Sequence, residues 1–246
     1  MEILAVRGLS KSYGGVRALR EVTFAVDAGE LLALIGPNGA GKTTCFNIIN
    51  GQVRPDAGEV LLDGEDLAGR PPREIWRRGV GRSFQVAATF GSMSVRENVQ
   101  VALLSHDGRL NSLLKDARKL LVREADELLE RVGMAAQAGR VCGELAYGDL
   151  KRVELALALA HRPRLLLMDE PTAGMAPEER QELMRLAADL ARRDKVAVLF
   201  TEHDVDVVFG FADRVVVLHG GEIIAAGTPP QVRNDARVRE VYLGDA

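Results

Sequence analysis

The stretch LLALIGPNGAGKTT, residues 31–44, constrains the fold more than any other part of this chain. Its first part, Leu31 to Ile35, is a short apolar run bounded by glycine, which predicts a strand buried on both faces of a parallel sheet. The glycines that follow permit positive backbone angles, so that successive amides point inward around an anion. Thr43 and Thr44 then stand at an expected helix start, where free amides favour negative charge. The segment therefore predicts a strand, loop and helix that bind a chain of phosphates.

The same segment fits the pattern G-x-x-x-x-G-K-[ST] through Gly36, Gly41, Lys42 and Thr43. In this pattern the lysine reaches the β and γ phosphates, and the hydroxyl binds Mg²⁺. The alternative is a glycine-rich turn that arose by chance. A strand before the loop and a helical pattern after it favour the phosphate-binding interpretation.

The composition places the chain among globular proteins and argues against several other classes. Its 246 residues are 47% hydrophobic and carry a formal net charge of −3, which suits a large core and gives no bulk attraction to nucleic acid. Cys45 and Cys142 have no metal-binding spacing and indicate no disulfide scaffold, which suits a reducing cytosol. The longest purely apolar stretch, residues 155–160, is far shorter than the roughly twenty residues of a membrane-spanning helix. The first ten residues show no secretion signal.

The front of the chain has the turns and short runs of an antiparallel region. Three runs predict strands, namely Ile3–Val6, Val22–Val26 and Glu59–Leu62. Asp27, Ala28 and Gly29 predict a hairpin turn between the second run and Leu31. Pro71 and Pro72 predict a short helix that ends at Gly79, and Val80–Phe84 is the next expected strand, ending at Gln85.

The pattern becomes helical from about residue 93 to 161. Ser94 and Glu97 predict a capping box, and Lys115–Val132 is strongly amphipathic. Strand and helix patterns then alternate again, and the expected elements are a strand at Leu165–Met168, a helix from Pro177 to about Arg193, a strand at Val196–Thr201, a hairpin of Arg214–Leu218 and Glu222–Ala226 around Gly220 and Gly221, and a helical tail that ends at Tyr242. We therefore predict an α/β fold with a doubly wound parallel core.

Two carboxylates follow one of the predicted core strands. In LLLMDEP, residues 165–171, Asp169 and Glu170 come just past a buried run, where ligands of open α/β sheets bind. Asp169 can hold Mg²⁺ through water, and Glu170 can orient or deprotonate the attacking water. The alternative, a polar strand exit, is common for these residues in isolation, and the phosphate loop favours the catalytic interpretation.

Three further features gain meaning only beside these motifs. His203 in TEHD follows another core strand, where an imidazole can contact the γ phosphate, although a lone histidine is usually structural or exposed. Gln85 ends its own strand and can contact both water and metal, although alone it would be an ordinary polar loop residue. Gly148 precedes an amphipathic helix and makes a second helix start able to hold an anion, or simply a glycine-containing helix entry. One nucleotide does not need two such sites, unless the second serves a neighbouring molecule.

Taken together, these motifs resemble the nucleotide-binding subunit of ABC transporters over essentially the whole chain. The resemblance implies one domain, residues 1–246, with a P-loop NTPase (RecA-like) core and an antiparallel β subdomain at about 1–92 and 162–228, a helical subdomain at about 93–161, and a tail at about 229–246. The implied catalytic residues are Lys42, Gln85, Glu170 and His203, and the implied metal ligands are Thr43, Gln85 and Asp169. The implied nucleotide-binding residues are Tyr13 (which stacks on adenine), Gly36, Pro37, Asn38, Gly39, Ala40, Gly41, Lys42, Thr43, Thr44, Ala146, Tyr147 and Gly148. For Tyr13 the alternative is a buried core aromatic.

The resemblance also implies cofactors and partners. ATP and Mg²⁺ are bound, and the signature motif, Leu145–Asp149, closes on the ATP that a second ATPase subunit holds in a head-to-tail dimer. A groove between the strand before Gln85 and the helical subdomain receives a cytoplasmic helix of a transmembrane permease subunit. A periplasmic or lipid-anchored solute-binding protein acts indirectly, nucleic acid is not a partner, and the chain lies on the cytoplasmic face of the inner membrane as a peripheral protein.

A narrower likeness is to the ATPases of branched-chain or hydrophobic amino-acid importers, carried by GRSFQ, SVRENV, LAYG, TAGMAP and the tail VREVYLG. The alternatives are the related ATPases for urea and amide uptake or lipopolysaccharide transport, a soluble ABC protein and a phosphotransferase. Four residues depart from the family pattern. Ala146 replaces a serine hydroxyl, Tyr147 replaces a glycine, Asp149 replaces glutamine, and Ala176 replaces an Asp or Asn helix cap worth about 1 kcal/mol. Two unequal ATP sites in a heterodimer would tolerate these losses, and a homodimer is the alternative.

Overall fold

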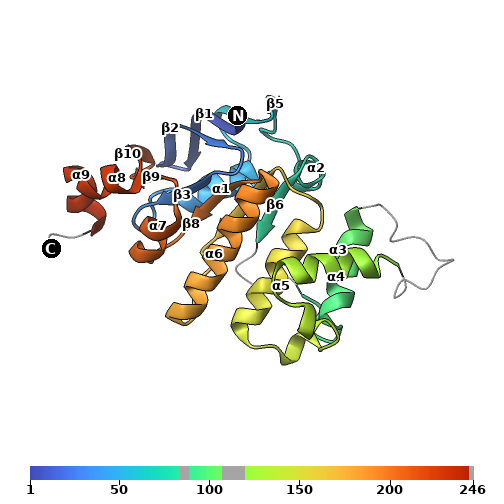
Figure 1. Ribbon diagram of the computed structural model, residues 1–246. Helices are drawn as coiled ribbons and strands as arrows, with labels where there is room; N and C mark the ends of the chain where they lie inside the picture. The colour runs from blue at the N-terminus through green and yellow to red at the C-terminus, as the bar shows by residue number, and fades with distance from the viewer. Residues whose placement is uncertain (84–88, 107–119, 244–246) are drawn as a thin grey trace.

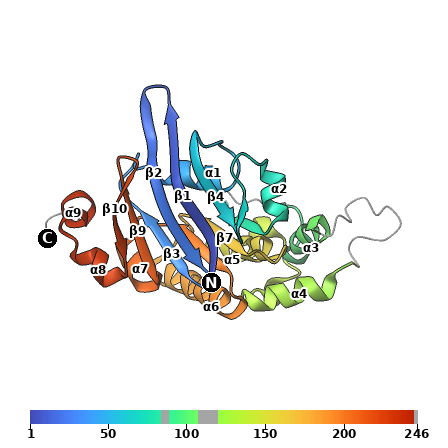
Figure 2. The same ribbon diagram turned by 90° about the horizontal axis from the view of Figure 1, so that it is seen from above.

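The computed structural model describes residues 1–83, 89–106 and 120–243, and it contains two sheets with helices packed around them. The smaller sheet has the strand order β2-β1-β4-β5 and is antiparallel. Its strands are β1 (Glu2–Tyr13), β2 (Val16–Asp27), β4 (Ala57–Leu62) and β5 (Glu65–Asp66). The long β1–β2 hairpin, closed at Gly14 and Gly15, projects from the molecule in Figure 2.

The hairpin turn predicted at Asp27, Ala28 and Gly29 is wrong. The chain does turn at residues 28 and 29, but β2 pairs with β1, whereas the following strand β3 (Leu31–Ile35) pairs with β8 (Ala197–Thr201) and β9 (Arg214–His219) in the other sheet. Turn chemistry specifies a change of direction and does not select the partner of the next strand.

The larger sheet has the order β10-β9-β3-β8-β7-β6, in which only the edge strand β10 (Glu222–Gly227) is antiparallel to its neighbour. The strands not yet bounded are β6 (Val80–Ser83) and β7 (Leu165–Asp169). The sheet residues of β3, β7 and β8 are buried throughout, as continuous apolar runs predict for parallel strands covered on both faces. The parallel α/β core is therefore confirmed, with β9 and β10 forming the expected hairpin.

The helices fall into groups that differ in position. α1 (Lys42–Ile49) and α2 (Pro72–Arg77) lie near the antiparallel sheet, and α6 (Pro177–Asp194) and α7 (Val205–Phe211) cover the parallel core. In Figure 1 the helices of the middle of the chain, namely α3 (Val95–His106), α4 (Val122–Arg131) and α5 (Tyr147–Leu159), lie on the opposite side of the molecule from α8 (Pro229–Asn234) and α9 (Ala236–Val238). The remaining short helical turns are 135–137, 142–144 and 239–243.

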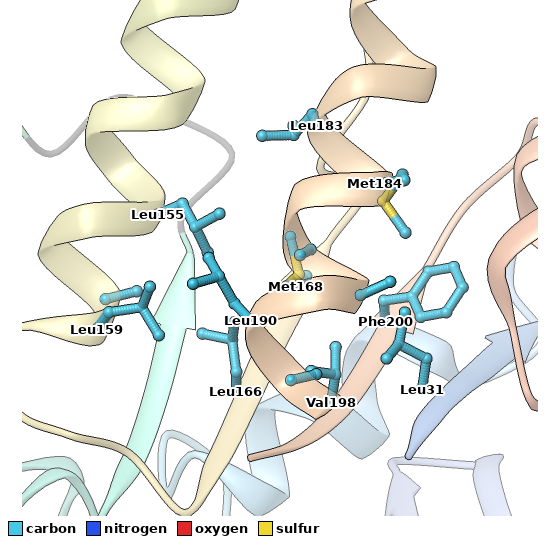
Figure 3. Close-up of a cluster of buried hydrophobic side chains, with 14 of the residues drawn as sticks. Leu31, Leu155, Leu159, Leu166, Met168, Leu183, Met184, Leu190, Val198 and Phe200 are labelled. Atoms are coloured by element: carbon cyan, nitrogen blue, oxygen red, sulfur yellow. The ribbon is translucent and has the colours of Figure 1, made fainter. Parts of the chain in front are cut away.

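Two hydrophobic clusters fix these layers. Alternate side chains of β3 point to opposite faces, so Leu31 and Ile35 join one cluster while Leu32 and Leu34 join the other, between the two sheets and around α1. Figure 3 shows the first cluster, in which side chains of α5 and α6 meet β3, β7 and β8, including Leu31, Leu155, Leu159, Leu166, Met168, Leu183, Met184, Leu190, Val198 and Phe200. Packing on both faces holds the carboxyl ends of the parallel strands in fixed relative positions.

The capping box predicted at the start of α3 is confirmed. The Ser94 amide donates to Glu97 Oε2 at 2.9 Å, and the Glu97 amide donates to Ser94 Oγ at 3.2 Å. The N-cap of α6 is Ala176, which has no side-chain acceptor for the first-turn amides. Of the two hydrogen bonds of a capping box, only one is present, in which the Ala176 amide donates to Glu179 Oε2 at 3.2 Å.

Candidate active site

The loop between β3 and α1 has the backbone that an anion cradle requires. Gly36, Gly39 and Gly41 have φ of 147°, 78° and 111°, and Gly41 is the residue before the first turn of α1. A Cβ on Gly36 would lie 2.0 Å from the carbonyl oxygen of Leu218, so no side chain fits there. The loop thus places its amides at the N-terminus of a helix, where phosphate binds.

Lys42 is buried against this loop. Its Nζ donates to the carbonyl oxygens of Gly36 at 2.6 Å and Pro37 at 3.1 Å. Burial lowers the pKa of the amine, and the negative charges of Glu170 and Asp169 oppose that shift. A strongly desolvated cation beside two carboxylates is suited to exchange its carbonyl partners for the oxygens of a polyphosphate.

Asp169 ends β7 and is fixed by two neighbours. Its Oδ1 accepts from Thr201 Oγ1 at 2.8 Å, and its Oδ2 accepts from Arg82 Nη2 at 3.2 Å. Because β7 lies beside β8, and β8 lies beside β3, the carboxyl ends of these strands bring Asp169 to the same edge of the sheet as Lys42.

Glu170 and His203 lie next to each other at that edge. Glu170 Oε1 and His203 Nε2 are 2.9 Å apart. The loop that carries His203 is anchored at buried Glu202, whose Oε1 accepts from the amide and the hydroxyl of Thr172 at 2.8 and 2.7 Å, and whose Oε2 accepts from the His203 amide at 3.2 Å. The structure therefore brings together four residues that the sequence motifs single out, namely Lys42, Asp169, Glu170 and His203.

Tyr13 lies at the far end of β1, with 48% of the residue exposed and Lys11 Nζ 5.5 Å from the ring centroid. An exposed ring is available for stacking, and the alternative of a buried core aromatic is excluded.

Thr43 and Thr44 occupy the first turn of α1, and Thr43 is exposed. Gln85 lies outside the described residues.

The comparisons with known proteins identify the family. A sequence model described as "ABC transporter" matches residues 19–173. The chain belongs to the ABC transporter family. A second model, described as "Branched-chain amino acid ATP-binding cassette transporter", matches residues 222–246, at the end of this ATP-binding cassette.

Curated relatives and solved structures agree with this assignment. The cassette is 40% identical to LivG, the high-affinity branched-chain amino acid transport ATP-binding protein of Escherichia coli K12, over 99% of its own length and 98% of that protein. It is 41% identical to BraF of Pseudomonas aeruginosa, with the same coverage. It is 37% identical to LptB, a lipopolysaccharide export ATP-binding protein of Haemophilus influenzae, over 100% and 98% of the two chains. Among solved structures, an ABC transporter cassette in its ADP conformation is 32% identical, covers 100% of both chains and gives a TM-score of 0.87. The cassette is thus an ATPase that binds ATP and ADP, as its relatives are.

The signature residues of the cassette lie at the start of α5, close to α6. Ala146 is the N-cap of α5, and Tyr147 is 46% exposed with its ring beside Gly174. A Cβ on Gly148 would lie 2.8 Å from Glu179 Oε1, so this glycine allows α6 to approach the helix start closely. Among the described residues, no hydrogen bond or ion pair joins these signature residues to the loop at residues 36–44.

A groove of about 490 Å³ separates α2 and β6 from the helices α3 and α5. Its largely apolar lining includes Trp76, Ala102 and Leu157, and the rings of Trp76 and His161 lie 5.0 Å apart, centroid to centroid. Arg82 lines the same groove. The sequence motifs assign no role to Arg82, although a cation inside a predicted core strand indicates a buried partner.

Within the described residues, no helix has the length and apolar character needed to cross a membrane. The same part of the chain contains no cluster of three or more His, Cys, Asp or Glu side chains that could hold a metal by themselves.

Proposed function

We propose that this cassette hydrolyses ATP to power the uptake of branched-chain or other hydrophobic amino acids. The observation that carries the ATPase part is the cluster of the phosphate loop, Asp169, Glu170 and His203 at one edge of the parallel sheet. The named functions of LivG and BraF, together with the match of residues 222–246 to the branched-chain amino-acid model, support the transported class.

The residues present fit a nucleotide with Mg²⁺. The cradle has no room for a Cβ at Gly36 or Gly41, and the Lys42 ammonium lies against the same loop, where it would reach the phosphates. Thr43 and Asp169 would hold Mg²⁺, which would neutralise charge on the phosphate oxygens, and Gln85 is proposed as a further ligand. The remaining loop residues, Pro37, Asn38, Gly39, Ala40 and Thr44, would surround the phosphates, and Tyr13 would stack on the adenine.

Hydrolysis would use the pair at the sheet edge. Glu170 would accept a proton from the attacking water, and His203, whose Nε2 lies 2.9 Å from Glu170 Oε1, would contact the γ phosphate and orient the carboxylate. Lys42 would stabilise the charge that develops on the phosphoryl oxygens. Thr201 and Glu202 fix the two loops, so the site needs little reorganisation before reaction.

We propose that a second cassette completes each site. Among the described residues, no hydrogen bond or ion pair joins the signature residues to the phosphate loop of their own chain, so Ala146, Tyr147 and Gly148 would close on ATP held by the partner. A relative of 26% identity, with a TM-score of 0.76, is described as a dimeric bacterial ABC transporter cassette. Ala146 and Ala176 lack polar groups that would contribute to the ATP site of the partner. We therefore favour a heterodimer in which the two ATP sites differ.

The groove beside Arg82 would receive a cytoplasmic helix of a permease subunit, which would place the cassette at the cytoplasmic face of the membrane. Its apolar lining suits an amphipathic helix, because side chains on one helix face would fill it. A solute-binding protein would act through the permease and not through this chain. The similarity to LptB makes lipopolysaccharide transport the second candidate, and 40–41% identity to LivG and BraF against 37% to LptB favours amino-acid import.

Two measurements test this proposal. Calorimetry of the purified chain with ATP and Mg²⁺ should show nucleotide binding, and an absence of binding at millimolar ATP would overturn the ATPase function. The transport class is tested by searching for permease genes beside the gene of this chain, reconstituting the cassette with their protein products and measuring ATP-dependent uptake of leucine. Uptake of urea or transfer of lipopolysaccharide in place of leucine would assign the alternative.

A further inference from the structure

Arg82 is nearly buried at a position that contacts Asp169 and also lines the groove. It lies on β6, the edge strand beside β7, and its side chain is 12% exposed. Its Nη2 is 3.2 Å from Oδ2 of Asp169, whose own side chain is 10% exposed. A charge pair this deep is poorly screened by solvent, so its geometry affects both partners.

The other side of the guanidinium is also anchored. Nη1 donates to Asn47 Oδ1 at 3.0 Å and to Gln52 Oε1 at 3.3 Å. Asn47 belongs to α1, the helix that begins at the phosphate loop. One planar side chain therefore joins the helix of the phosphate loop to the carboxylate at the end of β7, and a planar fork fixes such a geometry better than an ammonium does.

Asp169 is consequently oriented from both of its oxygens. Thr201 donates to Oδ1 at 2.8 Å, and Arg82 donates to Oδ2. Each carboxylate oxygen retains a further lone pair, so both bonds can persist while the carboxylate faces a cation or its water. Partners of this kind set the orientation of a metal ligand without touching the metal.

We propose that Arg82 is a positioning residue for the Mg²⁺ site, which holds Asp169 in its binding orientation and connects that site to the groove it lines. This rests on the proposed ATPase function and goes beyond it, because it assigns a role to a residue outside the nucleotide-binding motifs. The Mg²⁺ ligand is thus one side chain away from the surface that the permease would occupy.

The test separates an effect on Mg²⁺ binding from an effect on nucleotide binding. The affinity for a non-hydrolysable β,γ-imido ATP analogue is measured by calorimetry in Mg²⁺ and in EDTA, for the natural chain, Arg82→Met, Arg82→Lys and Arg73→Met. Arg73 lines the same groove, is exposed and has no hydrogen bond to Asp169, so Arg73→Met is the matched control. The gain in affinity from Mg²⁺ should fall about 10- to 100-fold in Arg82→Met. It should recover in part in Arg82→Lys and remain unchanged in Arg73→Met.

The affinity in EDTA should be the same in all four proteins. A Mg²⁺ gain in Arg82→Met equal to or above that of the natural chain would overturn the proposal, and so would an equal loss of affinity in Mg²⁺ and EDTA, which indicates a structural role alone. If Arg82→Met does not fold, the comparison is made with Arg82→Gln and Arg82→Lys, which keep hydrogen-bond donors. Absence of nucleotide binding by the natural chain would instead refute the proposed function, so the two failures are distinguishable.

Discussion

His203 Nε2 lies 2.9 Å from Oε1 of Glu170, although 33 positions separate the two residues in the chain. Glu170 has a φ of 49°, in the left-handed region, and its amide donates to the Thr201 carbonyl at 3.1 Å. The backbone therefore turns sharply after β7 and directs the carboxylate toward the loop that follows β8. An ordinary residue holds this conformation only where the surroundings enforce it, which is typical of functional positions.

This geometry predicts the effect of Glu170→Gln. The amide keeps the shape of the side chain but cannot accept a proton from water, so ATP binding should remain while turnover falls at least about 100-fold. ATP should then trap a closed dimer, which gel filtration measures beside a steady-state phosphate assay. Glu178→Gln, at an exposed position of α6, is the control and should retain turnover. Unchanged turnover in Glu170→Gln would remove this residue from the role of base.

The phosphate loop makes a second prediction, from two glycines that differ in their surroundings. A Cβ on Gly41 would lie 2.5 Å from the Ala18 carbonyl oxygen and 2.7 Å from Leu19 Cδ2, whereas a Cβ on Gly39 would meet nothing within 4 Å. Both have positive φ, so each Gly→Ala change costs about 1–2 kcal/mol of backbone strain. Gly41→Ala adds steric overlap, so its loss of unfolding free energy in urea should be the larger. Equal losses in the two variants would contradict the fixed loop geometry.

The parts of the molecule that follow from local chemistry could be predicted from the sequence. The phosphate loop, the capping box at Ser94 and Glu97 and the buried strand β3 each depend on residues that are near neighbours in the chain. The role of His203 is different. It is implied only by the resemblance to a known family, because a lone histidine after a strand has no specific function by itself.

Features that depend on long-range pairing could not be predicted in the same way. The turn at Asp27 was expected to close a hairpin, but the partner of β3 lies more than 160 residues away, in β8. The ion pair of Arg82 and Asp169 spans 87 positions and exists because β6 and β7 are neighbours in the sheet, which no local pattern encodes. Periodicity specifies which face of a strand is buried, and the strand order decides which charges meet.

The uncapped start of α6 yields a prediction about stability. Ala176 provides no side-chain acceptor, so Ala176→Ser should satisfy a free amide of the first turn and raise the unfolding free energy by about 1 kcal/mol. In a chain of this size that corresponds to a rise in Tm of about 2–4 °C, measured by calorimetry. Ala136→Ser, at an exposed position outside any helix cap, should leave Tm unchanged. A Tm for Ala176→Ser at or below that of the natural chain would show that a hydroxyl at this position does not satisfy a first-turn amide.

The thiol of Cys45 should report on the opening of α1. Cys45 is fully buried in that helix, one turn after the phosphate loop, and burial raises the pKa of its thiol to about 12 from an ordinary value of 9.0. Because only the thiolate reacts, labelling by a disulfide reagent at pH 8 should be about a thousandfold slower in the native protein than in urea, before shielding slows it further. The measurement uses Cys142→Ala, so that one thiol remains. ATP with Mg²⁺ should slow the labelling again, because ligand binding stabilises the loop from which α1 begins. Native labelling as fast as in urea would show that α1 does not bury this thiol in solution.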